Sequence, residues 1–466
     1  MMKESNSELY RIEIDTLGEV KVPLNAYWGP QTQRALDNFK ISSYKIPKEI
    51  IKAIALIKYA SAHVNFELGI LEEKYANAIK IAAEEIIYGE DFSNFPVDVF
   101  QTGSGTSTNM NVNEVISTRA NEVLTGKKNT NSPVHPNDHV NKGQSSNDVI
   151  PTSIRIATTL LIESELIPKL ELLKNSILKK SYQFRNIIKT GRTHLMDAVP
   201  ISFGQEFSGW AKQIENGIQR IKSTLPRLME LPIGGTAVGT GINTHPEFSK
   251  RVIKILSEKT GINFIPSENK FEGIASMDIA NEISGQLKTI AGSMMKIAND
   301  IRLMNSGPIS GMNEITIPPL QPGSSIMPGK VNPVIPEAVR MVCAKVIGND
   351  TTISISSSLG EFELNTMLPV IGFCLIESIT ILSNAAYLLS KKVIDGIRIN
   401  EKKVSEVLEK NPIIVTALTP LIGYEKASQI YKMCFSENKN IKEILLEKKI
   451  LPPEKINEYL DFKKMV

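Results

Sequence analysis

Apolar residues recur at helical spacing over most of the chain, and the longest stretches of this kind lie between residues 151 and 391. In the clearest stretch, an apolar side chain stands at every third or fourth position from Ile279 to Ile301, and the pattern ends at Ser306-Gly307-Pro308. Glycine followed by proline stops a helix, so a long helix is predicted here. Four similar stretches predict four more long helices, over residues 154–177, 205–231, 336–346 and 367–391.

Five long helices joined by short polar segments predict a helical bundle. Several of these helices are apolar around much of their circumference, which requires neighbours on most sides. A single bundle of five helices offers few positions that are surrounded in this way. We therefore expect the bundle to associate with further copies of the chain.

The segments outside the bundle carry weaker patterns. Residues 8–45 are expected to be irregular, with a strand-like piece at Tyr10–Ile14, whereas residues 47–88 and 112–124 show helical spacing. From residue 396 onwards the chain is rich in Lys and Glu and has turn signals such as Pro452-Pro453, which predicts a small helical domain. The predicted fold class is mainly all-α.

Composition narrows the class of protein. The 466 residues are 42% hydrophobic and 22% charged, with a net charge of +3, which is ordinary for a soluble globular protein and argues against nucleic-acid binding. The three cysteines have no paired spacing, as expected for buried thiols in a reducing compartment. Met1–Ser7 contains no apolar signal-peptide core, and Glu377 within the apolar run Val370–Leu389 favours a buried helix over a membrane span. We expect a soluble cytosolic protein.

One segment between two of the long helices, Gly323–Pro333, carries concentrated chemistry. Two glycines and two prolines exclude a helix or a central strand, so the segment is predicted to be an ordered loop. Lys330 supplies positive charge, Asn332 supplies a directed donor, and Gly323 lets backbone N–H groups approach an anion. A phosphate-binding P-loop is excluded, because five residues rather than four separate the glycines and Val331 replaces the required hydroxyl.

Three further polar segments accompany this loop. Gln101–Asn111 and Gly143–Asp148 each lead into a helix, where N–H and O–H donors can meet an anion. Thr193–Asp197 ends an extended segment and contains His194. Taken singly, helix capping or a structural histidine explains each of them. Taken together, they provide the donors and the acid–base group that a small dicarboxylate site needs.

Two other patterns are not assigned to a site. His135 and His139 are four residues apart, but Pro136 disfavours a regular helix and no third ligand has suitable spacing, so no metal is expected. Gly234–Gly241 resembles a dinucleotide-binding loop in its glycines, yet no alternation of strands and helices surrounds it. Neither a metal nor an organic cofactor is expected.

Such a set of groups suits the removal of a proton from the carbon beside a carboxylate. The dianionic carboxylate that forms needs preorganised donors, a role that fits Lys330 and Asn332. A serine near backbone N–H groups and Lys330 can act as an activated base. His194 can protonate the leaving group at neutral pH, and Glu337 can hold its charged form.

The segment Gly323–Pro333 resembles the signature loop of the fumarase/aspartase superfamily, and the resemblance extends from about Gly29 to the C-terminus. It implies that Ser324 is the base, that His194 with Glu337 forms the acid relay, and that Lys330 and Asn332 bind and polarise the reacting carboxylate. The other substrate contacts that it implies are Ser104, Gly105, Thr106, Ser145, Ser146, Asn147, Thr193, Ser325 and Val331.

The same resemblance implies three domains, over residues 1–144, 145–395 and 396–466, and a homotetramer with a central helical core. It further implies active sites shared between three subunits. His135, Pro136, Asn137 and Asp138 resemble a second, non-catalytic anion site of fumarases, although Ser132 stands where an arginine often contributes.

Two activities compete within the superfamily. Val334–Glu337 and Asp197–Pro200 resemble aspartases, whereas Gly103–Thr106 resembles fumarases. Among positions expected to touch substrate, aspartases usually have Ala where Ser104 stands and Thr where Ser146 stands, so these two hydroxyls favour a C2-hydroxyl substrate.

We therefore expect reversible hydration of fumarate to L-malate, with aspartate ammonia-lyase as the alternative. A non-catalytic structural member of the superfamily is a third possibility, but it would be expected to have a damaged loop or to lack His194, and both are intact.

Overall fold

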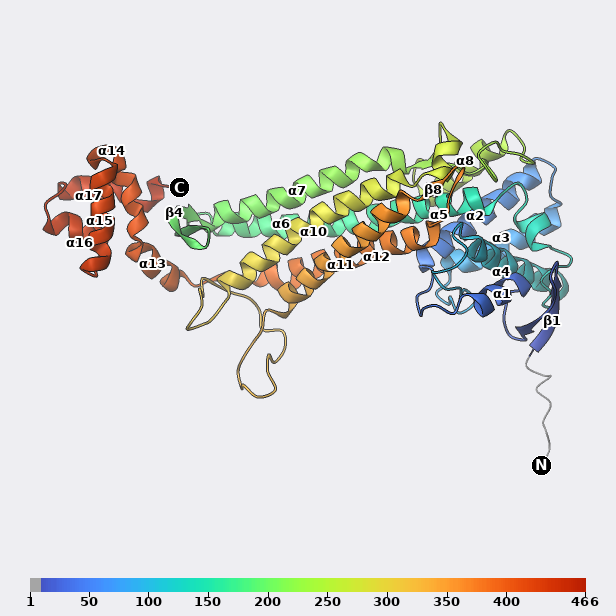
Figure 1. Ribbon diagram of the computed structural model, residues 1–466, viewed down its shortest axis with the longest axis horizontal. Helices are drawn as coiled ribbons and strands as arrows, with labels where there is room; N and C mark the ends of the chain where they lie inside the picture. Colours follow the sequence, from blue (N-terminus) through green and yellow to red (C-terminus); the bar gives the residue numbers. More distant parts are fainter. Residues whose placement is uncertain (1–9) are drawn as a thin grey trace, which may run out of the picture. The chain divides into compact units, whose positions relative to one another are not determined.

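The computed structural model describes residues 10–466 and is mainly helical (Figure 1). The chain forms two compact units. Unit 1 comprises the chain up to Ile167, Arg220–Lys288 and Lys345–Leu382, and unit 2 comprises Pro168–Gln219, Thr289–Ala344 and Ser383–Val466. Within the described residues, strands occur only as two-stranded pairs. The expectation of a mainly all-α fold is confirmed.

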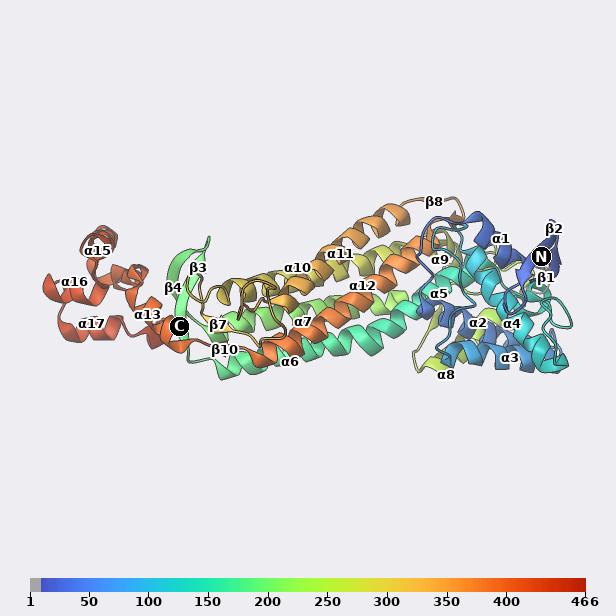
Figure 2. The same ribbon diagram turned by 90° about the horizontal axis from the view of Figure 1, so that it is seen from below.

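The five long helical patterns all form helices. The first becomes α5 (Ser146–Leu161), a π-helical turn (Ile162–Leu166) and α6 (Ile167–Gln183). The other four are α7 (Phe203–Leu228), α10 (Asp278–Met304), α11 (Val334–Ser357) and α12 (Leu368–Leu388). In both units these helices run alongside one another (Figures 1 and 2). Apolar side chains at the predicted spacing fill the space between them, and Ile283, Leu287 and Ile297 of α10 are fully buried.

One helix among the described residues, Leu368–Gly396 including α12, is long and apolar enough to cross a membrane. In its most apolar window, 67% of the residues are buried inside the structure, as in the core helix of a soluble protein. The cysteines Cys343, Cys374 and Cys434 are also buried, and all three are free thiols.

Unit 1 places shorter helices around the N-terminal ends of α4 and α5. It contains the hairpin β1–β2 (Tyr10–Asp15 and Gly18–Pro23), and the predicted Met1–Ser7 segment lies outside the described residues. Its other elements are α1 (Pro30–Asn38), α2 (Lys48–Glu67), α3 (Glu73–Tyr88), α4 (Thr106–Thr125), a π-helical turn (Pro136–Val140), α8 (Phe248–Thr260), α9 (Lys270–Ala275) and the two-residue strands β5 (Glu230–Leu231), β6 (Ile265–Pro266), β8 (Gly360–Glu361) and β9 (Leu364–Asn365).

The expectation that residues 8–45 are irregular is wrong for α1. The N-terminal N–H groups of this helix are capped by a distant side chain, the buried carboxylate of Glu114 on α4. Glu114 accepts hydrogen bonds from the backbone N–H groups of Gly29, Gln31 and Thr32 at 2.8–3.0 Å. Because the capping group lies more than 80 residues further along the chain, Pro30 at the first helical position is the local start signal, and no local side chain caps this helix.

Unit 2 contains the hairpin β3–β4 (Ile188–Thr193 and Met196–Ser202), the pair β7–β10 (Ile315–Thr316 and Arg398–Ile399) and the C-terminal helices. These helices are α13 (Glu401–Lys410), α14 (Thr419–Ile422), α15 (Tyr424–Ser436), α16 (Ile441–Glu447) and α17 (Pro453–Tyr459). Leu418, Ile430, Ile444 and Ile456 belong to one buried cluster, so this region has a small core of its own. The domain limits at residues 144 and 395 remain predictions.

Candidate active site

The first predicted binding loop ends at the N-terminus of α4. Gly105 caps the helix with a φ of +73°, and a β-carbon on Gly103 would lie 1.8 Å from the carbonyl oxygen of Thr366. Only glycine fits position 103, which allows the loop to pack directly on the backbone before α12. Ser104 and Thr106 then share a hydrogen bond of 2.8 Å between their hydroxyl oxygens. This packing holds two of the predicted substrate-binding hydroxyls side by side.

The second predicted binding loop ends at the N-terminus of α5. The Ser145 hydroxyl oxygen accepts from the Asn147 N–H at 3.2 Å, and the Ser145 N–H donates to Asp148 Oδ1 at 2.9 Å. Asp148 Oδ2 accepts from the N–H groups of Gly234 and Thr236, both at 2.9 Å. The fully buried Asp148 carboxylate therefore joins the start of α5 to the glycine-rich segment that follows α7. Asn147 adds a second tie, because its Nδ2 donates to the Ala237 carbonyl at 2.7 Å.

The structure brings these two helix starts together. Gly105 packs against the side chain of Ile150 on α5, and Asn109 Nδ2 on α4 donates to the Ser146 hydroxyl oxygen at 3.1 Å. Two neighbouring helix N-termini that carry hydroxyls form a favourable place for a carboxylate, since unpaired N–H groups and helix dipoles both attract negative charge. Unit 1 thus gathers six predicted binding residues: Ser104, Gly105, Thr106, Ser145, Ser146 and Asn147.

The signature loop, Gly323–Pro333, lies in unit 2 and closes on itself. The Gly323 N–H donates to the Lys330 carbonyl at 2.8 Å, and Asn332 Nδ2 donates to the Gly323 carbonyl at 2.7 Å. A β-carbon at Gly323 would lie 2.7 Å from the Lys330 oxygen, so glycine is required where the two ends of the loop meet. In this structure Asn332 donates within the loop, and its predicted contact with the substrate carboxylate remains a prediction.

Ser324 occupies a special position in this loop. Its hydroxyl oxygen accepts hydrogen bonds from the backbone N–H groups of Ile326 at 3.2 Å and of Met327 at 3.1 Å. Two N–H dipoles aimed at one oxygen stabilise negative charge on it, as in an oxyanion hole. Ser325, Lys330 and Val331 are exposed around it. The loop therefore presents a serine oxygen suited to losing its proton, with an exposed lysine six residues further along the chain.

His194 lies at the tip of the β3–β4 hairpin (Figure 2). Thr193 pairs with Met196, so His194 and Leu195 form a two-residue turn with φ values of +57° and +62°. Positive φ at both positions is the geometry of a type I′ turn, which normally selects Gly, Asn or Asp. Two residues with β-carbons in this region carry backbone strain, which is often found at functional sites. Both side chains are exposed.

Buried charges anchor the base of this hairpin. Lys189 and Arg192 on β3 both contact the carboxylate of Glu314, at 3.0 and 2.6 Å. Glu314 precedes β7, whose chain continues into the signature loop. Lys189 also contacts Glu206 of α7 at 3.0 Å. Paired charges with this degree of burial fix the strand that presents His194, because removing Glu314 would take a carboxylate partner from both cations.

The acid relay predicted for His194 and Glu337 is not formed within one chain. Over residues 10–466, no hydrogen bond or ion pair joins His194 to Glu337 or to Ser324. Glu337 lies in the first turn of α11 and is partly exposed. The relay therefore remains a prediction.

The predicted second anion site borders a cavity of about 480 Å³ in unit 1, which His135, Pro136 and Asn137 line. His135 Nδ1 accepts from the N–H groups of Asn137 and Asp138, both at 3.2 Å. The same nitrogen lies 3.3 Å from the exposed Asp138 carboxylate. Arg34 also lines the cavity but is paired with Asp15. Occupation by an anion remains a prediction.

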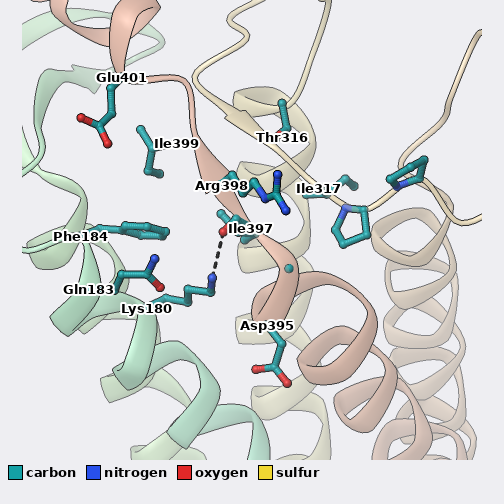
Figure 3. A pocket seen from close by; sticks show the side chains of 13 residues that line it. Lys180, Gln183, Phe184, Thr316, Ile317, Asp395, Ile397, Arg398, Ile399 and Glu401 are labelled. Carbon is teal, nitrogen blue, oxygen red and sulfur yellow. Dashed lines mark hydrogen bonds between the residues drawn. The ribbon is translucent and has the colours of Figure 1, made fainter.

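A larger cavity, of about 690 Å³, lies in unit 2 and contains none of the predicted site residues (Figure 3). Lys180, Phe184, Pro318 and Arg398 line part of it, and Lys180 Nζ donates to the Ile397 carbonyl at 2.9 Å. A β-carbon at Gly396 would lie 2.2 Å from the Pro318 ring, so the 3-10 turn that precedes β10 packs tightly on the segment after β7.

Sequence reasoning missed the residues that hold the binding loops. Lys58 on α2 is fully buried beneath the start of α5, and Asp148 is fully buried beside it. Burial lowers the pKa of Lys58 to about 7 and raises the pKa of Asp148, while the opposite charges of the two groups partly offset both shifts. The spacing of Ser145 and Asp148 is a capping-box pattern that could have identified Asp148. Lys58 stands in an apolar helical pattern that gives no such signal.

Comparison with known proteins extends over nearly the whole chain. A family model described as "Lyase" matches residues 18–348, and one described as "Fumarase C C-terminus" matches residues 414–466. The class II fumarate hydratase of Xylella fastidiosa is 51% identical over 460 residues, which cover 99% of this chain and 96% of that protein. The class II fumarate hydratase of Thermus thermophilus is 48% identical over 450 residues, which cover 96% of each.

Comparison with solved structures also gives a match over nearly the whole chain. The crystal structure of a class II fumarase from Schistosoma mansoni superimposes with a TM-score of 0.95, at 39% identity, covering 98% of this chain and 99% of that one. Both the sequence match and the structural match run through the signature loop, the hairpin and the two helix N-termini. The chain belongs to the class II fumarate hydratase family.

Proposed function

We propose that this chain catalyses the reversible hydration of fumarate to L-malate. The observation that carries the proposal is the Ser324 oxygen, which accepts two backbone N–H groups in an exposed loop that also contains Lys330. This arrangement lowers the cost of removing the serine proton, as a general base for a weakly acidic C–H requires. The names of the relatives support the same activity.

Each group then has a role in the proposed reaction. Ser324 removes the proton at C3 of L-malate, and Lys330 and Asn332 stabilise the dianionic carboxylate that forms. His194, supported by Glu337, protonates the departing hydroxyl. The paired helix starts of unit 1 bind the other carboxylate through the Ser104, Thr106, Ser145, Ser146 and Asn147 side chains, with Thr193, Ser325 and Val331 completing the site. No metal or organic cofactor takes part in these steps.

The proposed site is completed by other copies of the chain in a homotetramer, with residues from three subunits in each site. The exposure of His194, Lys330 and Val331 supports this, because catalytic groups act most strongly where bulk water is kept away. Exposed positions on α11 also support it. Met341, Ala344, Gly348 and Ile355 are small or apolar, lie on one helical stripe and are exposed in the single chain. A cytoplasmic location is proposed from the three free, buried thiols.

The test is the ultraviolet absorbance of fumarate, measured with purified protein and no added metal. L-Malate and L-aspartate are supplied in parallel at equal concentration. We expect absorbance to rise with L-malate alone. A rise with L-aspartate alone would replace the proposal with aspartate ammonia-lyase, and no rise with either would leave the chain as a lyase for another substrate or as a non-catalytic member of its family.

A further inference from the structure

We propose that Lys58 is a positioning residue for substrate binding, because through Asn141 and Asn109 it fixes the Ser146 hydroxyl as a hydrogen-bond donor toward the substrate carboxylate. The inference rests on the proposed function, in which Ser146 contacts substrate. It concerns a chain of buried and partly buried polar groups in unit 1 that runs from α2 through the loop before α5 and across α4.

The chain starts at Lys58, whose side chain has 0% exposure. Its Nζ donates to Asn141 Oδ1 at 2.8 Å and to Gln144 Oε1 at 2.9 Å. Neither partner is charged, so these amide oxygens replace the water that the buried amine has lost. An ammonium has three N–H donors, and even the neutral amine has two, one for each oxygen.

The orientation of both amides is fixed from the opposite side as well. Gln144 Nε2 donates to the Val140 carbonyl at 3.1 Å, and Asn141 Nδ2 donates to the Gln144 carbonyl at 3.2 Å. With their NH2 groups on carbonyl oxygens, both side chains must direct their own oxygens at Lys58. The reverse orientation would place donors against donors and acceptors against acceptors.

This orientation determines the next bond. Asn141 Oδ1 also lies 3.3 Å from Asn109 Nδ2, and only an NH2 group can bond to that oxygen. The same Asn109 Nδ2 lies 3.1 Å from the Ser146 oxygen, which must accept its second hydrogen. Asn109 is completely buried, and its Oδ1 has no hydrogen-bond partner in the structure. Burying an oxygen without a hydrogen-bond donor costs free energy of folding. The two hydrogen bonds on Asn109 Nδ2 must therefore be what keeps the side chain in this orientation.

The hydrogen bond from Asn109 determines the direction of the Ser146 hydroxyl hydrogen. Because its oxygen accepts from Asn109, the hydroxyl hydrogen must point elsewhere, and within residues 10–466 this hydrogen has no acceptor among the side chains or carbonyls. Ser146 is 9% exposed and stands in the first turn of α5, directly after the capping residue Ser145. A hydroxyl held with its hydrogen outward is prepared to donate to an anion without reorienting, which favours binding.

The chain of bonds predicts an effect on KM rather than on kcat. The carboxylate bound by unit 1 keeps its charge through the reaction, so a donor to it stabilises substrate and transition state alike. In Lys58→Met, which removes every donor at similar length, we expect KM for L-malate to rise about tenfold while kcat changes less than threefold. Ser61→Ala, a buried hydroxyl less than one turn further along α2, is the matched control and should leave both constants unchanged.

A double-substitution cycle separates positioning from general damage. If Lys58 acts through Ser146, Lys58→Met should have almost no effect on KM when it is added to Ser146→Ala. An undiminished tenfold effect in that background, or an unchanged KM in Lys58→Met alone, would overturn the inference. Should Lys58→Met not fold, as judged by its thermal unfolding and elution volume, Asn109→Leu takes its place in the same cycle with the same expected results.

The wild-type protein distinguishes this inference from the proposed function. If the wild type does not convert L-malate, the proposed function fails, and the inference fails with it. If the wild type is active and the cycle shows no coupling, only the role of Lys58 is wrong.

Discussion

The signature loop and the paired helix N-termini perform the two halves of the proposed chemistry, and they are built in opposite ways. The loop is held by bonds between its own atoms, and the side chain of Ile326 at its tip is 82% exposed. The helix N-termini are held by side chains from several segments that are far apart in the sequence, among them the buried Lys58, Asn109 and Asp148. The reactive serine therefore depends on local geometry, whereas the binding hydroxyls depend on tertiary packing.

This difference leads to different consequences for substitution. A change in the loop should remove activity and leave stability intact, since few contacts with the rest of the fold are lost. A change beneath the helix N-termini should affect stability as well, because buried polar groups would be left unpaired. The following predictions test this contrast, from the largest expected effect to the smallest.

Ser324→Ala removes the proposed base and should lower kcat for L-malate about 10³-fold to 10⁴-fold, the upper part of the range expected when acid–base catalysis is lost. Within residues 10–466 the hydroxyl forms hydrogen bonds only inside its own loop, so the thermal unfolding temperature and the oligomeric state should not change. Absorbance of fumarate and size-exclusion chromatography measure both. Ser325→Ala, the adjacent exposed serine, is the comparison variant and should lose much less. Near-normal turnover by Ser324→Ala would mean that another group is the base.

His194→Asn should lower kcat about 10²-fold and retain binding of the dicarboxylate. Asparagine tolerates positive φ better than histidine does, so the hairpin turn should be at least as stable as before. Turnover and fumarate binding by calorimetry test the two statements separately. If binding is lost together with turnover, the residue serves mainly to hold substrate, and its assignment as the acid would be withdrawn.

Asp148→Ala should destabilise the fold by about 2–4 kcal/mol, because three backbone N–H groups lose their buried acceptor. Urea unfolding measures the difference. Asp138→Ala provides a contrast, since that carboxylate is exposed and should contribute less than about 0.5 kcal/mol. Equal effects of the two substitutions would contradict the claim that tertiary packing holds the start of α5.

The smallest effect concerns pH. Burial lowers the pKa of Lys58 to about 7 in the folded state, whereas the unfolded chain has a value near 10.5. Between these values the unfolded state binds more protons, so stability should rise with pH, by at most about 1.4 kcal/mol per pH unit. Lys58→Met should lack this contribution. Urea midpoints of both proteins at pH 7 and pH 8.5 test it, and parallel pH dependences would show that Lys58 keeps an ordinary pKa.

The sequence predicted the signature loop better than it predicted the groups that hold the helix N-termini. The signature loop could be read directly, because Gly323, Ser324 and Lys330 lie within one short segment whose residue types already imply a loop and its chemistry. The long helices could be read as well, since burial of α10 follows the predicted spacing of Ile279 to Ile301. Both features are encoded locally.

The residues that support the helix N-termini could not be predicted from the sequence, because their roles depend on partners far away along the chain. Lys58 interrupts an apolar pattern like many surface lysines, and only the approach of Asn141, 83 residues away, makes it a buried donor. The cap of α1 by Glu114 is hidden for the same reason. Gly103 could be identified as a loop glycine, but its contact with the backbone at Thr366 follows only from the folded chain.

The exposed signature loop also has a consequence for proteolysis of the single chain. Its backbone from Ser325 to Gly329 bonds only to atoms of the same loop, so a protease can bind it in an extended form without unfolding a helix. A single cut there would separate Ser324 from Lys330 while α10 and α11 stay folded. If the protein forms the proposed homotetramer, chains outside it would be cut at the loop that contains the proposed base. The rate of cleavage would then report the fraction of chains that had not assembled.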